Sequence, residues 1–405
     1  MKSRRQNISR RNTRSMTFVN GRGNTLPISI ELVMEIFSWL PAKSIARCRC
    51  VSKLWNAVLR RPDFTELYLT RSYSDRPQLL FAFRDEKENG FVFFSLQHPQ
   101  NPVENSSFAV ATSRFTHSLK LYDIVGISNG FVLLRGIKRN PPGVLSLLFN
   151  PSTGQSLLLP EVKPVVKPDC YMIGLTKFMG YDPVKKQFKV LSANMSGVCG
   201  DYERYDEFQV LTLGIGKPSW RMVECCLPHY PKSGGICING VFYYLGAADR
   251  GFDQSIMVVC IDLTSEKFSF LNFSGPMQGA TTLINYNGKL GSLMSKYFYG
   301  RDTSFELWVL DDLEKKEWSK HVFVLYPPVW QHAVEGATLR FFGVVGTNEF
   351  VFVPAFLYKP FYVFYYNVEK NTVVRVGVRG MKGFYGDSVD DFSNHVENVE
   401  LIRAF

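Results

Sequence analysis

Hydrophobic residues in the stretch 26–66 recur at the spacing of amphipathic helices. A first helix is expected to begin after Leu26-Pro27, with Ser29 as its N-cap, and to end before Pro41. Because its apolar positions lie three and four residues apart, they share one wide side of the helix. These positions are Leu32, Val33, Ile36, Phe37 and Leu40.

Two shorter apolar runs complete this N-terminal unit. The second contains Ile45 and Cys48, and the third ends at Pro62. Apolar residues of the third run are Val51, Leu54, Trp55, Val58 and Leu59. Helices this short cannot bury so many apolar side chains among themselves, because a small unit has a large surface for its volume. Part of this apolar surface is therefore predicted to face a partner.

The hydrophobic pattern changes after an expected connector at residues 67–77. From Gln78 onward, short runs of β-branched and aromatic residues alternate with turns rich in Gly, Asn, Asp and Pro, which is typical of an all-β region. Examples of the predicted strands are LLFAF (79–83), FVLL (131–134), VFYYL (241–245), ELWVL (306–310) and FYVFYYNV (361–368).

Two kinds of turn recur between these predicted strands. Asn-Gly and Asn/Asp turns favour tight hairpins, because these residues tolerate the left-handed backbone conformation. The Asn-Gly turn occurs in SNGFVLL (128–134), INGVFYYL (238–245) and YNGKLGSL (286–293). The second kind occurs in FNPSTGQSLLLP (149–160), YDPVKKQFKVL (181–191), IDLTSEKFSFL (261–271), LDDLEKKEWSK (310–320) and YNVEKNTVVRV (366–376).

The resulting repeat has the length of a four-stranded propeller blade. Six units are expected near 78–115, 121–160, 178–226, 235–275, 281–326 and 340–380, and a seventh is left open. The tail with Val396, Val399, Leu401 and Ile402 is expected to form a strand that closes the ring onto the first unit. The predicted fold class is α+β multidomain, a small helical unit followed by an all-β, propeller-like domain.

Residues 26–66 resemble an F-box. The matching motifs, in the family's order and spacing, are Leu26-Pro27, Glu35-Ile36, Leu40-Pro41-Ala42-Lys43-Ser44, Arg49-Cys50-Val51-Ser52-Lys53 and Trp55. Cys48 departs from the pattern, because the family more often carries an aromatic residue there. The alternative is an unrelated helical cap whose apolar stripe is core. Residues 78–405 resemble, more loosely, the F-box-associated domain of a large class of plant proteins, with kelch-like units that lack most of the paired glycines.

The resemblance implies a substrate-recognition subunit of an SCF-type cullin–RING ubiquitin ligase. Its F-box would dock on a Skp-type adaptor, and its β domain would bind an unknown protein target. Two alternatives are an interaction module that binds the adaptor without directing degradation, and an enzyme built on a propeller. The positions matched to the F-box fold and its docking surface are Leu26, Pro27, Leu32, Ile36, Leu40, Pro41, Ile45, Val51 and Trp55.

The net charge of +11 is concentrated at the N-terminus. Residues 1–25 contain seven basic and no acidic residues, which leaves only +4 for the rest of the chain. This favours a disordered basic arm, either a nuclear-import signal or a solvated tail, over a folded surface that binds nucleic acid. No apolar run is long enough to span a bilayer, and no secretory signal is recognisable. We therefore expect a nuclear or cytoplasmic protein without membrane contact.

Candidate catalytic or cofactor-binding patterns are missing from the sequence. The eight cysteines include no CxxC pair, the six histidines are scattered, and GxSxG is absent. The Gly-rich segment 213–218 and the acid pairs Asp311-Asp312 and Asp390-Asp391 fit polar turns better than active sites. We therefore expect no cofactor, no metal and no catalysis. Four aromatic residues are expected in loops, where they belong either to the core or to an exposed rim that binds a partner. They are Tyr202, Tyr205, Trp330 and Tyr358.

Overall fold

The structure is a computed structural model of the 405-residue chain. It describes residues 28–74, 78–85, 88, 90–97, 106–108, 110–116, 120–139, 142–163, 170–198, 201–214, 218–248, 256–271, 281–294, 297–299, 302, 304–325, 327–334, 336–345, 349–357, 359–381 and 390–402. The expected basic arm, Leu26, Pro27 and Tyr358 lie outside these ranges.

Four helices form the N-terminal unit: α1 (Ile30–Ser38), α2 (Ala42–Val51), α3 (Lys53–Val58) and α4 (Pro62–Ser74). The predicted N-cap is confirmed, because the Ser29 hydroxyl accepts a hydrogen bond from the Leu32 N–H at 3.3 Å. Pro62 both ends the third apolar run and begins α4, since proline loses no hydrogen bond in the first turn of a helix. Most of the expected connector, through Ser74, is therefore helical.

The helices enclose one apolar core. Phe37 of α1 packs edge-on against Trp55 of α3, with ring centroids 4.9 Å apart. The core also includes Val399, from the other end of the chain. Its fully or largely buried residues are Val33, Met34, Phe37, Ala42, Ile45, Val58, Leu59, Phe64, Tyr68 and Val399.

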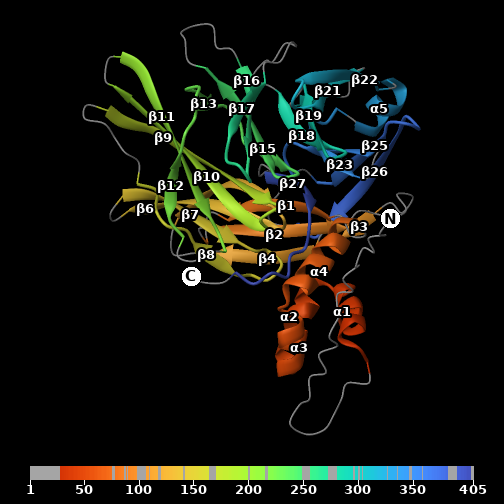
Figure 1. Ribbon diagram of the computed structural model, residues 1–405. Coiled ribbons are helices and arrows are strands. Elements are labelled where there is room, and N and C mark those ends of the chain that lie inside the picture. Colours follow the sequence, from red (N-terminus) through yellow and green to blue (C-terminus); the bar gives the residue numbers. More distant parts are fainter. Residues whose placement is uncertain are drawn as a thin grey trace, which may run out of the picture.

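The described strands form six sheets, each built mainly from one of the six predicted units (Figure 1). The first sheet contains, in pairing order, β27 (Asp390–His395), β1 (Gln78–Asp85), β2 (Gly90–Gln97) and β4 (Val110–Thr116). The second contains β5 (Lys120–Ser128), β6 (Phe131–Arg139), β7 (Pro142–Phe149) and β8 (Ser156–Leu158). The third contains β12 (Trp220–Val223), β11 (Asp201–Thr212), β10 (Gln187–Val198) and β9 (Cys170–Asp182).

The remaining three sheets follow the same plan. In the fourth, β13 (Tyr230–Pro231) and β14 (Ile236–Ile238) both pair with β15 (Val241–Ala247), followed by β16 (Ile256–Asp262) and β17 (Phe268–Leu271). The fifth contains β18 (Thr282–Tyr286), β19 (Lys289–Leu293), β21 (Ser304–Asp312) and β22 (Glu317–Val324). The sixth contains β20 (Tyr297–Phe298), β23 (Leu339–Val345), β24 (Glu349–Pro354), β25 (Phe361–Asn367), β26 (Thr372–Arg379) and the parallel strand β3 (Ser106–Phe108).

The sheets are arranged in a closed ring. One strand of each sheet contacts a strand of both neighbouring sheets, in the order β27, β5, β9, β14, β18, β23 and back to β27. The ring is closed by β27, which pairs antiparallel with β1. The tail prediction was therefore right about closure by the C-terminal end and wrong about the residues. Asp390–His395 form the closing strand, whereas residues 396–402 contain no strand.

The predicted hairpin turns have the expected backbone. Asn129-Gly130, Asn239-Gly240 and Asn287-Gly288 all have positive φ at both residues. In the second kind of turn, an Asn or Asp side chain accepts hydrogen bonds from backbone N–H groups two or three residues later. For example, Asn150 Oδ1 accepts from Ser152 and Thr153. Three such turns carry Asp instead of Asn: Asp182, Asp262 and Asp312.

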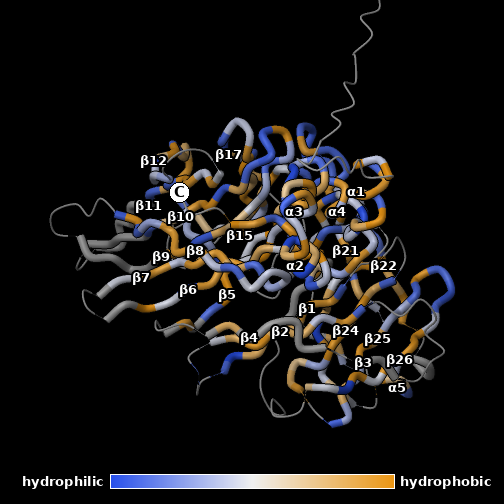
Figure 2. The backbone as a smooth tube through the Cα atoms, turned by 90° about the horizontal axis from the view of Figure 1, so that it is seen from below, coloured by the Kyte–Doolittle hydropathy of each residue, from blue (hydrophilic) through white to orange (hydrophobic). Residues whose placement is uncertain are grey.

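Apolar side chains fill the space between neighbouring sheets. Phe93 of β2 packs against Phe149 of β7, and Phe81 of β1 packs against Phe342 of β23. Because both faces of the middle strands are covered, several of them, such as β15, β16 and β24, are almost continuously hydrophobic (Figure 2). Trp330, expected in a loop, lies instead in helix α5 (Pro327–Val334), where it is fully buried and donates to the Tyr299 carbonyl at 2.8 Å.

Candidate functional site

The first helix of the N-terminal unit has two apolar sides. Val33, Met34 and Phe37 face the core and are buried. Leu32 and Ile36, four residues apart, keep 56% and 55% of their surface exposed. A helix that is apolar on both sides can bury only one of them in a unit of this size, so the second side stays at the surface.

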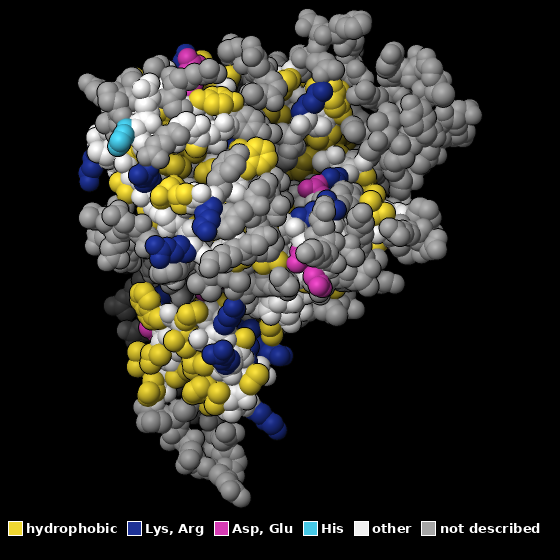
Figure 3. Space-filling model, turned by 180° about the vertical axis from the view of Figure 1, so that it is seen from behind, with side chains coloured by type: hydrophobic (Ala, Val, Ile, Leu, Met, Phe, Trp, Pro, Cys, Tyr) yellow, Lys and Arg dark blue, Asp and Glu magenta, His cyan; other side chains and the backbone are white. Residues whose placement is uncertain are grey.

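Other large apolar side chains of the unit are also exposed. Val51, at the end of α2, is 65% exposed, and Ile28 and Trp39 extend the exposed side of α1. Figure 3 shows hydrophobic side chains gathered over the helical protrusion below the sheets. We call Ile28, Leu32, Ile36, Trp39 and Val51 the apolar face. Clusters of exposed apolar side chains of this kind mark protein-interaction sites.

The structure divides the predicted docking residues into two groups. Leu32, Ile36, Pro41 and Val51 are exposed and available to a partner. Leu40 and Trp55 are half-buried against the helical core, and Ile45 is fully buried in it. Cys48, which departs from the F-box pattern, is half-buried and packs with its small side chain against the same core. Leu26 and Pro27 lie outside the described residues.

Two residues of the apolar face were missed by the sequence prediction. Trp39 lies three residues after Ile36, so helical spacing would have placed it on this side. Ile28 precedes the N-cap Ser29, so helical spacing does not apply to it. Trp39 lies against the Arg71 guanidinium, 4.0 Å from its ring centroid. Arg71 also pairs with Glu35 and donates to the Ser38 hydroxyl at 2.6 Å, which joins α4 to α1.

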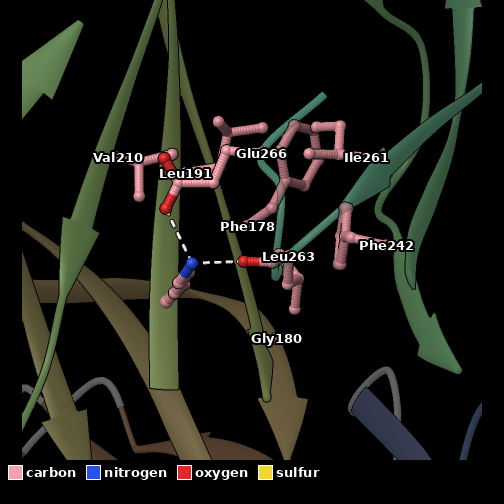
Figure 4. Close-up of a pocket in the computed structure, with 9 residues that line it drawn as sticks. Phe178, Gly180, Leu191, Val210, Phe242, Ile261, Leu263 and Glu266 are labelled. Carbon is pink, nitrogen blue, oxygen red and sulfur yellow. Dashed lines mark hydrogen bonds and ion pairs between the residues drawn. The ribbon is translucent and has the colours of Figure 1, made fainter. Parts of the chain in front are cut away.

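A narrow cavity lies between the sheets of β9–β12 and β13–β17 (Figure 4). It is lined mainly by apolar groups, including Phe178 and Phe242, and its volume of about 10 Å³ has room for about one water molecule. Buried Lys189 donates to the Leu263 carbonyl and to Glu266 at 2.6 Å. The cavity is therefore a gap beside an ion pair that joins two sheets, and it is too small for an organic ligand.

The residues that the structure describes include no group of three His, Cys, Asp or Glu side chains that could hold a metal. His229 lies between sheets, where its Nε2 is 2.6 Å from the Tyr244 hydroxyl, and burial lowers its pKa. This histidine contacts packed aromatic rings, so it acts as a core residue.

Within the described ranges, no helix has the length and hydropathy needed to cross a membrane.

Comparisons with known proteins agree with this architecture. The family described as "F-box domain" matches residues 26–67, and the family described as "F-box associated beta propeller domain" matches residues 78–396. A putative F-box protein of Arabidopsis thaliana is 49% identical over 98% of this chain and 97% of its own length. The A. thaliana "F-box protein DOR" is 47% identical over 99% of this chain and all of its own length.

The class is therefore that of a helical F-box followed by an all-β propeller. The chain belongs to the plant F-box proteins that carry an F-box-associated β-propeller domain. The kelch-like character of its individual repeats stays a prediction.

Proposed function

We propose that this protein is the substrate-recognition subunit of an SCF-type cullin–RING ubiquitin ligase. The F-box docks on a Skp-type adaptor through the apolar face, and the propeller binds a protein target. The observation that carries this proposal is the exposure of Leu32 and Ile36 on a helix whose other side is buried. When a partner covers these apolar side chains and removes them from water, the free energy of binding becomes more favourable.

The protein contributes proximity rather than covalent chemistry. By holding the target near a ubiquitin-charged enzyme in the same complex, it raises the effective concentration of the target's lysines. The helical unit lies beneath one end of the propeller, where the Tyr73 hydroxyl donates to Asn129 Oδ1 of the first Asn-Gly turn (Figure 1). We place the target at the opposite end of the ring.

A second candidate function is an adaptor-binding module that does not direct degradation. Both functions use the same apolar face, so the two differ only in the fate of the bound target. Accumulation of a ubiquitylated target when the proteasome is inhibited would favour the ligase subunit.

We further propose residence in the nucleus, the cytoplasm or both, with the basic arm as a nuclear-import signal.

The adaptor-docking proposal is tested with Ile36→Asp. This change places a charge on the apolar face, where docking would strip it of water without a compensating partner, so adaptor binding should be lost. Ile36 is more than half exposed, so the free protein should still fold. Copurification with a Skp-type adaptor measures docking, and thermal unfolding measures the fold.

The matched control is Val322→Asp, which also replaces an exposed apolar residue, 54% accessible, but on strand β22 of the propeller. This control should bind the adaptor like the unmodified protein. Undiminished adaptor recovery with Ile36→Asp would contradict the proposal. Leu40→Asp is a poorer test, because Leu40 packs against the helical core and its replacement should unfold the F-box itself.

A further inference from the structure

The segment that follows the closing strand lies between the propeller and the F-box. Residues 396–402, which we call the strap, leave β27 and contact both parts of the molecule. Val396, Asn398 and Val399 are at most 2% exposed, although the segment has no regular secondary structure. Burial of an irregular segment requires that its polar groups find partners, and the strap's partners come from both sides.

On the F-box side, the strap completes the helical unit. Helix α2 has Pro41 as its N-cap and no side-chain cap of its own. Glu397 Oε2 accepts hydrogen bonds from the Ala42 N–H at 3.2 Å and from the Tyr68 hydroxyl at 2.9 Å. A carboxylate at the first N–H groups of a helix also interacts favourably with the helix dipole. Glu397 therefore caps α2 from 355 residues away.

A second contact reaches the F-box core itself. The Val399 side chain is fully buried among the core residues of the helices. The Val399 carbonyl accepts a hydrogen bond from Arg49 Nη2 at 2.7 Å, and the same nitrogen donates to the Leu59 carbonyl at 2.7 Å. One arginine thus joins α2, the end of α3 and the strap.

On the propeller side, the strap is held by Asn398 and by the turns of the second sheet. Asn398 Nδ2 donates to the Asn129 carbonyl at 2.7 Å, and the Asn398 N–H donates to the Ser152 hydroxyl at 3.2 Å. Asn150 Nδ2 donates to the Asn398 carbonyl at 3.0 Å and to the Glu400 carbonyl at 3.3 Å. The strap is therefore anchored to two different turns.

Asparagine at position 150 can both form its turn and bind the strap. The turn itself needs only a side-chain oxygen, and Asp provides it at the corresponding positions 182, 262 and 312. Asn150 provides the same oxygen and adds an amide donor, which an aspartate lacks, for the strap. Asn367 occupies a similar turn in the sixth sheet, where its Oδ1 accepts from the Lys370 N–H.

We propose that the strap sets the orientation of the F-box on the propeller, with Glu397 and Asn150 as its positioning residues. The consequence for ubiquitin transfer rests on the proposed function. Because the strap connects the adaptor-binding unit to the target-binding ring, it sets where a bound target lies relative to the rest of the ligase. A loosened strap would leave both docking events intact and lower the rate of transfer.

An ion pair between the F-box and the propeller allows the orientation to be measured. Glu66 of α4 and Lys186 of the β9–β10 turn form an exposed ion pair between the two parts, with 2.7 Å between nitrogen and oxygen. A carbodiimide converts such a pair into an amide bond, and mass spectrometry measures its yield. The full-length protein alone suffices for this readout, which needs no adaptor and no target.

Two variants weaken the strap at different ends. Glu397→Ala removes the cap of α2, and Asn150→Asp keeps the turn oxygen but loses the donor to the strap. Both should lower the Glu66–Lys186 cross-link. Glu397→Ala should also raise amide exchange at Ala42 by about tenfold, since a hydrogen bond to a charged group is worth about one decade in an equilibrium constant.

Two controls define the result. Glu397→Gln keeps an acceptor oxygen and should retain most of the cross-link. Asn367→Asp makes the same change as Asn150→Asp in a turn without a described strap contact, and it should give the unmodified yield. If Glu397→Ala does not fold, the cross-link yields of Asn150→Asp and Asn367→Asp decide whether the strap sets the orientation.

A yield in Glu397→Ala and Asn150→Asp equal to that of the controls would overturn the role of the strap. With the strap confirmed, both variants should bind the adaptor normally and ubiquitylate a bound target more slowly. Failure of the unmodified protein to bind any Skp-type adaptor would remove the proposed function. It would leave the cross-linking result untouched, so the two failures are distinguishable.

Discussion

At the scale of the residue, one buried histidine of the ring lacks hydrogen-bond partners among the described residues. His395, the last residue of β27, is fully buried, and within the part of the chain that the structure describes neither of its ring nitrogens has a hydrogen-bond partner. It lies opposite Gln78 in the register of β27 and β1. Burial lowers the pKa of His395 from 6.5 to about 4, because the charged form would be stripped of water.

This histidine should make the protein less stable in acid. Between pH 6.5 and about 4 the unfolded chain binds a proton at this position and the folded chain does not, so the free energy of unfolding falls as the pH falls. The loss should be about 3 kcal/mol across this interval. Urea unfolding at several pH values, compared between the unmodified protein and His395→Leu, measures it.

The variant should lose this part of the pH dependence, and His332→Leu, at an exposed position, should keep it. Identical pH profiles of the unmodified protein and His395→Leu would show that His395 is not the responsible group.

At the scale of the element, the same kind of turn serves different neighbours. Gly130 and Gly288 both occupy the second position of an Asn-Gly turn with φ of +80°. A Cβ atom on Gly130 would lie 2.5 Å from the Val396 carbonyl oxygen, whereas on Gly288 the nearest atom would be 3.6 Å away. Gly130 is therefore required for the hairpin and also for the close approach of the strap.

This difference predicts unequal effects of two identical substitutions. Gly288→Ala should cost about 1–2 kcal/mol, because alanine disfavours the left-handed conformation. Gly130→Ala should cost about 1–3 kcal/mol more, because the strap backbone must also move. Denaturant unfolding of both variants measures the difference. Equal losses of stability would mean that the strap does not pack against this turn as the structure shows.

At the scale of the whole molecule, the C-terminal end has two separate tasks. Residues 390–395 close the ring by pairing with β1, and they also contact β5 and β23 on either side. Residues 396–402 connect the closed ring to the F-box. A ring without its closing strand would expose the edge of β1, which is a site for aggregation.

Two truncations should separate these tasks. Removal of 396–405 should give a soluble protein with a closed ring and a less stable F-box, which loses the buried Val399 side chain, worth roughly 1.5–3 kcal/mol. Removal of 390–405 should give a protein that aggregates or fails to accumulate, since total domain stability is only about 5–15 kcal/mol.

Size-exclusion chromatography and thermal unfolding compare the two truncated proteins. A soluble, monomeric protein with an unchanged melting temperature after removal of 390–405 would contradict closure of the ring by β27.

The sequence by itself determined the features that depend on neighbouring residues. The N-cap at Ser29, the Asn-Gly turns and the division into six strand units could all be predicted, because helical spacing and turn chemistry act over a few residues. The F-box motifs were recognisable for the same reason.

Only the tertiary structure decided how the two apolar sides of the F-box are used and where the tail lies. Ile45 and Leu32 have the same hydrophobic character, yet one is fully buried and the other is more than half exposed. Val399 belongs to the core of helices more than 300 residues earlier, and Glu397 caps one of them. Such contacts leave no periodicity in the sequence, because they depend on the path of the whole chain around the ring.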